Sequence, residues 1–113
     1  MPLSDQDRQE LAELKDRFRA VLPERLATIR SCRRVQTPYQ GEELKILFRV
    51  VHQLAGTGRA FGFDAITTLA EIPEPSLRGL LDGQISLSPT LVEALDSQLD
   101  RLCEELARQA PGD

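Results

Sequence analysis

The sequence predicts an all-α protein, an antiparallel four-helix bundle with either an additional N-terminal helix or a kinked first helix. Apolar residues recur at helical spacing along most of the chain. No run alternates β-branched and polar residues in the manner of a half-buried strand. Proline and glycine instead divide the chain into helix-length segments joined by short loops, which is typical of helical bundles.

The first helical segment begins after Ser4 or Asp5, either of which can cap a helix N-terminus. Its apolar residues share one face: Leu11, Leu14, Phe18, Val21 and Leu22. Pro23 has no backbone N–H, so we expect the helix to break or kink there. Helical spacing then continues to about Val35. Residues 1–35 are therefore expected to form either one kinked helix or two helices.

The middle of the chain contains two further predicted helices. A loop at 36–41, with both proline and glycine, precedes the first of them. This helix runs through LKILFRVVHQLAG towards Arg59. A tight connection around Gly62 leads to the next helix, over about 63–72. That helix is expected to end where two prolines follow.

The C-terminal part begins with a predicted loop over 73–87, which can hold one short turn at 77–81. Ser88 then provides an N-cap, and Pro89 suits the first helical position. The last helix is expected from Pro89 to about Gln109. Its apolar stripe consists of leucines: Leu91, Leu95, Leu99, Leu102 and Leu106.

Length and composition limit the class of protein. The 113 residues correspond to one domain, 1–113, and 28% charged with 41% hydrophobic residues is ordinary for a globular chain. No apolar run approaches the ~18 residues that span a bilayer, so we expect no membrane segment. The chain starts without a basic region followed by an apolar stretch, so no signal peptide is expected and the predicted location is cytoplasmic.

Charge and cysteine content argue against nucleic acid and metal. Residues 1–59 carry a net charge of +3 and residues 60–113 a net charge of −7, which gives the overall −4. Neither half is basic enough to indicate nucleic-acid binding. Cys32 and Cys103 are far apart, and the chain has one histidine, so we expect two buried thiols and no metal site or cofactor.

The helix that begins near residue 41 carries the only histidine, His52. At about 100° per residue, most of its leucines and valines form one broad apolar side. A narrow polar stripe remains, made of Lys45, Arg49, His52, Gln53, Gly56 and Arg59. His52 lies at the edge of this stripe, so we expect a partly exposed imidazole, which is a nucleophile when neutral.

Two cations and two glycines accompany the histidine. Lys45 and Arg59 lie seven residues before and after His52, nearly in line, and would stabilise a phosphoryl group on the imidazole. Gly56, one turn on, leaves the imidazole open to a large partner. Glycine inside a helix costs about 1 kcal/mol relative to alanine, so Gly56 and Gly58 need an explanation. The simpler interpretation is a solvated helix face whose glycines mark the helix end.

The run HQLAGTGRAFGF, from His52 to Phe63, resembles the signature of histidine-containing phosphotransfer (Hpt) domains. That signature has an apolar residue two positions after the histidine and glycines four and ten positions after it. Leu54, Gly56 and Gly62 match these positions. The helix before the histidine, the helix after the run and the long C-terminal helix are also placed as in that family.

The resemblance implies a four-helix antiparallel bundle that exposes His52 as the phosphoacceptor. Such domains accept a phosphoryl group from the aspartyl phosphate of a response-regulator receiver domain, or from a sensor or hybrid histidine kinase, and pass it on. They are carriers rather than enzymes. Gly56 would give the receiver access, and Gly62 would pack tightly after the helix. Arg49 and Gln53, on the same stripe, are expected to contact the partner.

Two features depart from the family pattern. The basic residue expected three positions after the histidine is Ala55 here, so Arg59 or Lys45 would have to hold the phosphoryl group. If neither does so, docking without phosphoryl transfer becomes the function. Pro73 and Pro75 also shorten the helix that precedes them.

Three functions therefore compete: a monomeric phosphorelay carrier, a docking module for a kinase or response regulator, and a DNA-binding helix-turn-helix. The spacing of residues 69–83 resembles repressor-like domains. However, residues 60–100 contain one basic residue, Arg78, against seven acidic ones, which disfavours contacts with DNA phosphates. Phe61 or Phe63 would add to a docking surface, although core packing explains Phe63 better.

Overall fold

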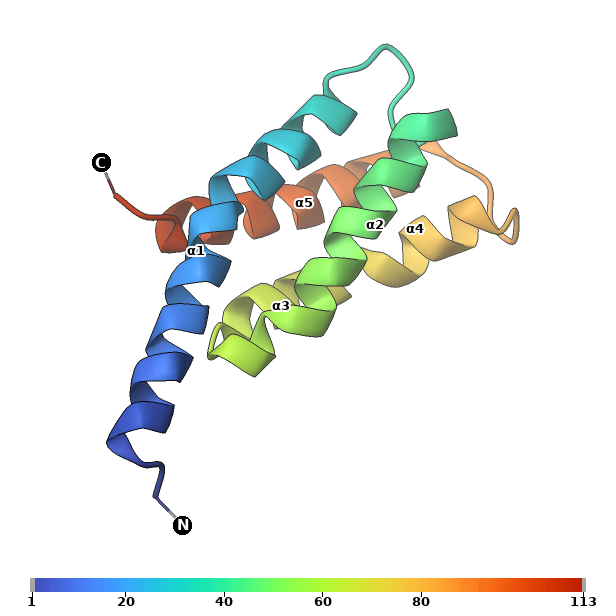
Figure 1. The fold of residues 1–113 in the computed structure, drawn as a ribbon. Coiled ribbons are helices and arrows are strands. Elements are labelled where there is room, and N and C mark those ends of the chain that lie inside the picture. Colours follow the sequence, from blue (N-terminus) through green and yellow to red (C-terminus); the bar gives the residue numbers. More distant parts are fainter. Residues whose placement is uncertain (1, 113) are drawn as a thin grey trace.

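In the computed structural model, which describes residues 2–112, the chain forms five α-helices and one 3-10 turn (Figure 1). The elements are α1 (Asp5–Arg33), α2 (Gly41–Thr57), η1 (Arg59–Phe61), α3 (Asp64–Glu71), α4 (Glu74–Leu81) and α5 (Pro89–Gln109). No strand occurs among these residues, so the predicted all-α class is confirmed. None of the helices in 2–112 is long and apolar enough to cross a membrane.

Helix α1 continues through Pro23, so of the two alternatives predicted for residues 1–35 the single helix is correct. Pro23 is exposed, and its ring removes one backbone hydrogen bond at a cost of about 3 kcal/mol. Each buried aliphatic or aromatic side chain contributes about 1.5–3 kcal/mol. The apolar face on both sides of Pro23 therefore outweighs the lost bond; its buried members are Phe18, Leu22, Leu26, Ile29 and Cys32.

The first turns of α1 extend past the rest of the bundle (Figure 1). Ser4 caps this end, since its side chain accepts a hydrogen bond from the backbone N–H of Asp7 at 3.0 Å. Leu11 is half-buried and Leu14 is 43% exposed, so the first part of the predicted apolar face lies beyond the core. The cause is length: α1 has 29 residues, against 17 in α2 and 21 in α5.

Helix α4 replaces the first half of the loop predicted over 73–87, and the short turn expected at 77–81 is the second part of this helix. Pro73 is its N-cap and Pro75 lies in its first turn, where backbone N–H groups have no intrahelical partner and proline is tolerated. Leu77 is fully buried and anchors the helix. Gly79 allows Ile85 to pack closely, since an added Cβ would lie 3.0 Å from Cγ1 of Ile85.

The core lies between α1, α2, α3 and α5, and α4 packs against α2 and contributes Leu77 to the core. The largest fully buried aliphatic side chains are Leu22, Ile29, Leu47, Val51, Leu54, Ile66, Leu77, Leu95, Leu99, Leu102 and Leu106. Helix α5 begins as predicted: the side chain of Ser88 accepts from the N–H of Leu91 at 3.1 Å, and Pro89 is in the first turn. Cys32 and Cys103 are buried free thiols.

The loop between α1 and α2 is fixed to α5. Tyr39 has a left-handed backbone, with φ of 64°, and its buried hydroxyl donates to the carboxylate of Asp96. Arg33, at the end of α1, forms ion pairs with Asp100 at 2.9 Å and Asp96 at 3.6 Å. These contacts hold the start of α2, and thus the helix with the histidine, in register with the core.

Candidate functional site

His52 lies on the outer surface of α2, with 58% of its side chain exposed. Its neighbours Val51 and Leu54 are almost fully buried. Since the apolar face of α2 is fixed in the core, the helix cannot rotate to bury the imidazole. The ring is therefore presented to solvent.

Glu74, in the first turn of α4, holds one edge of this ring. Its Oε1 lies 2.6 Å from Nδ1 of His52, and only 21% of the Glu74 side chain is exposed. A carboxylate accepts hydrogen bonds, so this contact assigns the proton to Nδ1. In the neutral ring, Nε2 then carries the free lone pair and is the nucleophilic atom.

Phe48, one turn before His52 on α2, supports the face of the imidazole. The two ring centroids are 5.6 Å apart and the planes differ by 12°, so the rings are stacked. Arg78 of α4 places its guanidinium carbon 4.7 Å from the centroid of Phe48. Helix α4 thus supplies two charged residues to the surroundings of His52.

The sequence pattern assigned neither Glu74 nor Arg78 to the site, because it predicts a loop over 73–87 with one short turn at 77–81. A signal was available. Proline in the first turn followed by helical spacing to Leu77 and Leu81 is typical of a helix start.

The two cations predicted to hold a phosphoryl group have other surroundings. Nζ of Lys45 lies 3.6 Å from a carboxylate oxygen of Glu42, towards the start of α2. Arg59 lies beyond the end of α2, which stops at Thr57 rather than continuing to Arg59, and its backbone N–H donates to the Thr67 hydroxyl at 2.7 Å. Neither side chain has a hydrogen bond or ion pair with His52 within residues 2–112.

The remaining residues of the polar stripe are exposed on α2. Arg49 and Gly56 both face solvent. Gln53 borders a shallow groove between α1, α2 and η1, whose other lining residues are Phe18, Val21, Arg25, Leu54, Thr57 and Phe61. The stripe therefore borders an apolar depression on the side of α1.

The structural explanation for glycine differs between positions 56 and 58. A Cβ added to Gly56 would meet no atom within 4 Å, so internal packing does not require glycine there. A Cβ on Gly58 would lie 2.8 Å from the hydroxyl of Thr67 and 3.1 Å from the carbonyl oxygen of Phe63. Gly58 thus permits close packing of α2 against α3, whereas Gly56 only leaves open surface beside His52.

The aromatic residues after α2 pack on α1. Phe63 is buried and stacks on Phe18 at a centroid distance of 5.1 Å, so the core interpretation of Phe63 is confirmed. Phe61 is half-buried and lies 5.4 Å from the same ring. Gly62, between them, has φ of +86°, a conformation that glycine adopts without strain.

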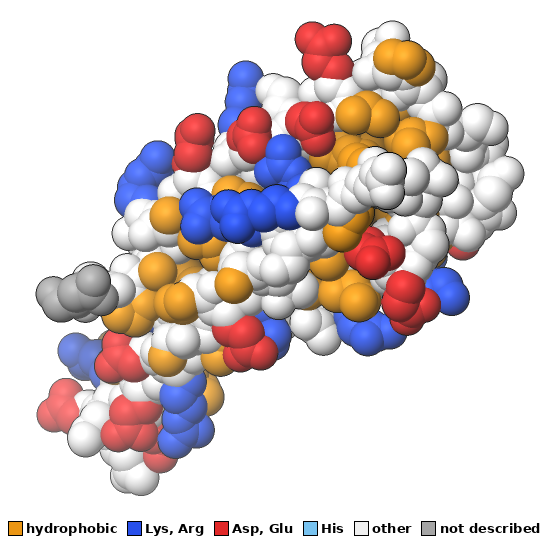
Figure 2. All heavy atoms as spheres, turned by 90° about the horizontal axis from the view of Figure 1, so that it is seen from above, with side chains coloured by type: hydrophobic (Ala, Val, Ile, Leu, Met, Phe, Trp, Pro, Cys, Tyr) orange, Lys and Arg blue, Asp and Glu red, His pale blue; other side chains and the backbone are white. Residues whose placement is uncertain are grey.

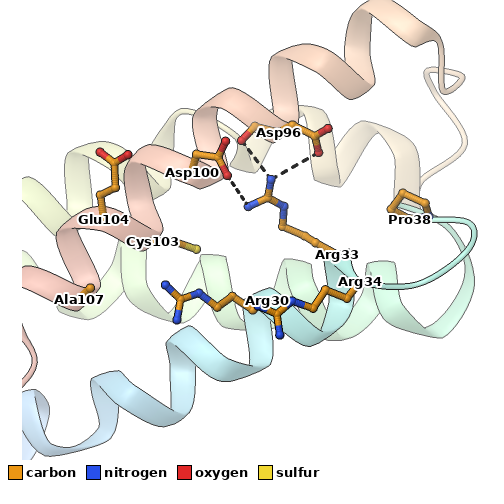
Figure 3. Close-up of a pocket in the computed structure, with 9 residues that line it drawn as sticks. All are labelled: Arg30, Arg33, Arg34, Pro38, Asp96, Asp100, Cys103, Glu104 and Ala107. Carbon is orange, nitrogen blue, oxygen red and sulfur yellow. Dashed lines mark hydrogen bonds and ion pairs between the residues drawn. The ribbon is translucent and has the colours of Figure 1, made fainter.

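A second concave region lies between α1 and α5, with basic residues on one wall and acidic residues on the other (Figure 3). Arg33 points across it to Asp96 and Asp100, so these charges are used to join the helices. Figure 2 likewise shows charges of both signs distributed over one face of the molecule. The concave region between α1 and α5 is therefore separate from the surroundings of His52, which are formed by α2 and α4.

The family model of the Hpt domain matches residues 7–107, nearly the whole chain. The chain belongs to the Hpt domain family. It is also similar to the chemotaxis protein CheA of Cereibacter sphaeroides, with 32% identity over 74 residues. That match covers 66% of this chain but 11% of CheA, so this Hpt chain spans a small part of its relative. No solved structure matches the chain with significance.

Membership of the Hpt family confirms the resemblance predicted from the sequence and supports a phosphotransfer module of two-component signalling. The matched range includes α2 with His52 and α4 with Glu74.

Proposed function

We propose that this chain is a phosphoryl carrier, in which His52 accepts a phosphoryl group from a receiver-domain aspartyl phosphate or from a histidine kinase. The observation that supports this most is an exposed imidazole with Nδ1 2.6 Å from Glu74. Residues 1–113 act as one monomeric, cytoplasmic carrier module that needs no cofactor or metal of its own. The groups that activate the phosphoryl donor belong to the partner.

The chemistry follows from the proton on Nδ1. The lone pair of Nε2 attacks phosphorus, and an Nε2–P bond forms while the bond from phosphorus to the aspartyl oxygen breaks. That oxygen keeps the bonding electrons and becomes a carboxylate again. The phosphorylated ring retains its Nδ1 proton and becomes cationic, and the Glu74 carboxylate stabilises this charge. The reverse steps pass the group to another receiver.

The surface around His52 suits a large partner. Gly56 leaves open space one turn from the imidazole. Arg49 and Gln53 are exposed on the same helix and contact the docked receiver or kinase. Their positions allow a partner to approach Nε2 without displacing the contact of Nδ1 with Glu74.

The direct test uses a receiver domain that carries a radiolabelled aspartyl phosphate. We expect label to move to the wild-type chain, where it is lost in acid and retained in base, as a phosphoramidate should be. His52→Gln should accept none, while its circular dichroism spectrum stays that of the wild type. Gln36→Ala, at an exposed position in the loop before α2, serves as the control and should still accept label. Label that stays on the receiver, or that moves equally to His52→Gln, would contradict the proposal.

A docking module without phosphoryl transfer is the second candidate. Ala55, which replaces the family's basic residue, favours it. This alternative predicts that partner binding survives His52→Gln and that no acid-labile label appears on the wild type. We do not propose DNA binding, because α3 has no basic residue and α4 has one, Arg78.

A further inference from the structure

We propose that Arg78 of α4 is the cation that binds the phosphoryl group on His52. This inference rests on the proposed function, because it assigns a role in holding the transferred group. The family's basic residue is absent at position 55, and within residues 2–112 neither Lys45 nor Arg59 has a hydrogen bond or ion pair with the imidazole. The structure supplies a cation from another helix instead.

The contacts of α2 with α4 place Arg78 near His52. The two helices lie side by side (Figure 1). Glu74 meets His52, and Arg78, one turn later, meets Phe48, one turn earlier on α2. The ring of Phe48 is in turn stacked on the imidazole. The guanidinium and the imidazole therefore both contact one phenyl ring.

The helical geometry also places Arg78 on the appropriate side of the histidine. At ~100° per residue, Phe48 and Ala55 are displaced from His52 in the same direction, by about 40° and 60°. Phe48 contacts α4, so this direction faces α4. A lysine at position 55 would lie on the same side as the guanidinium of Arg78. Arg49 and Gly56 are displaced in the opposite direction, towards the groove beside α1.

The guanidinium is free to change partner. Arg78 is exposed and forms no ion pair within the described residues, whereas Arg33 is held by Asp96 and Asp100. Its contact with the Phe48 ring is a cation–π interaction at the surface, which is weak. A phosphoryl group offers charged oxygens that a guanidinium binds with two hydrogen bonds. The side chain needs only to turn from the phenyl ring towards Nε2.

The test separates binding of the phosphoryl group from docking of a protein. Potassium phosphoramidate serves as donor: Nε2 attacks phosphorus, the P–N bond breaks and ammonia leaves. The rate of labelling and the half-life of the phosphohistidine are measured for wild type, Arg78→Gln and Arg78→Lys. Arg101→Gln, at an exposed position on α5, is the matched control, and Lys45→Gln and Arg59→Gln are tested as rivals. Circular dichroism and thermal unfolding check that each variant folds.

We expect Arg78→Gln to reduce the labelling rate by about tenfold or more, the usual effect of losing a charged hydrogen bond. Arg78→Lys should recover part of the rate, and Arg101→Gln should behave as the wild type. Equal rates for wild type and Arg78→Gln, or a loss confined to Lys45→Gln or Arg59→Gln, would overturn the role of Arg78 but not the proposed function. No label on the wild type from phosphoramidate or from a charged receiver would overturn the proposed function as well.

Discussion

At the scale of single residues, the imidazole of His52 is fixed by two contacts of different kinds. The carboxylate of Glu74 determines which nitrogen holds the proton, and the phenyl ring of Phe48 determines the plane of the ring. An exposed side chain is normally free to change rotamer. Here both contacts reduce that freedom before a partner arrives, so less ordering is required when the phosphoryl donor docks.

Replacement of Glu74 tests the first contact. In metal sites, replacement of a carboxylate that orients an imidazole lowers metal affinity or activity by about 10–100-fold. We expect a loss of labelling rate in that range for Glu74→Gln. The amide oxygen still accepts the Nδ1–H bond but cannot balance the charge of the phosphorylated ring. The measurement is the labelling rate with phosphoramidate. Glu71→Gln, at the exposed end of α3, is the control, and similar rates for both variants would show that the carboxylate has no such role.

Alanine substitutions at Gly56 and Gly58 are expected to have opposite effects on stability. Gly56→Ala should raise the free energy of unfolding by about 0.5–1 kcal/mol, because alanine is the better helix former and no atom obstructs its Cβ. It should also slow transfer from a receiver, because the added methyl group lies on the docking surface. Urea unfolding and receiver labelling measure the two effects.

Gly58→Ala provides the comparison. Its Cβ would lie within 3.1 Å of two groups on the α3 side, so we expect a loss of about 1–3 kcal/mol in the same urea titration. Labelling by phosphoramidate should be retained in the fraction that stays folded. A stability gain for Gly58→Ala would contradict the close packing of α2 against α3.

At the scale of elements, Pro23 shows that tertiary packing can override a local helix breaker. Replacement by alanine restores a backbone N–H in the middle of α1 and removes the steric conflict with the preceding turn. We expect Pro23→Ala to raise the free energy of unfolding by up to about 3 kcal/mol. Thermal unfolding measures this, with Ala27→Gly on the exposed face as a control that should lower stability by about 1 kcal/mol. An unchanged midpoint for Pro23→Ala would contradict the account.

The sequence was sufficient to predict the helices that begin at Gly41, Asp64 and Pro89, because each combines a start signal with a continuous apolar face. It was insufficient for α4. There, Pro73 and Pro75 indicate the end of a helix when they are considered alone, although proline in a first turn costs no hydrogen bond. That error also concealed the surroundings of His52, since Glu74 and Arg78 belong to this helix.

The exposure of His52 could be predicted from periodicity, because burial of the apolar face of a helix determines which side chains at its edge reach solvent. The cation that lies near the imidazole could not be predicted from periodicity. The spacing of Lys45 and Arg59 gives their direction on one helix, whereas the contact of Arg78 depends on how a second helix packs. Contacts between helices cannot be obtained from the period of either helix alone.

At the scale of the whole molecule, the buried hydroxyl of Tyr39 joins the loop after α1 to α5. Burial, and then the hydrogen bond to Asp96, raise the pKa of Tyr39 well above its ordinary value of 10. The folded state therefore keeps this proton where the unfolded chain loses it. At pH values below the ordinary pKa, the contribution of Tyr39 to stability is constant. It falls as pH rises from the ordinary pKa towards the folded-state pKa.

Tyr39→Phe tests this linkage. The variant should be less stable than the wild type at neutral pH by about 1 kcal/mol, because it lacks the hydrogen bond to Asp96. The difference in stability should shrink at about pH 11. At that pH the unfolded wild type has lost the Tyr39 proton and must take it up again to fold, whereas the variant has no such proton. Urea unfolding at both pH values measures the difference. A difference that grows with pH would contradict the assigned direction.

The projecting start of α1 divides the molecule into regions of unequal local stability. Its first turns are exposed and have no neighbouring helix, so their backbone hydrogen bonds can open without disturbing the leucine core. Amide hydrogens there should exchange in a fast phase, and those around Leu22 in the slow, global one. A protease that trims this end would shorten the particle while leaving the cooperative transition of the remaining bundle in place.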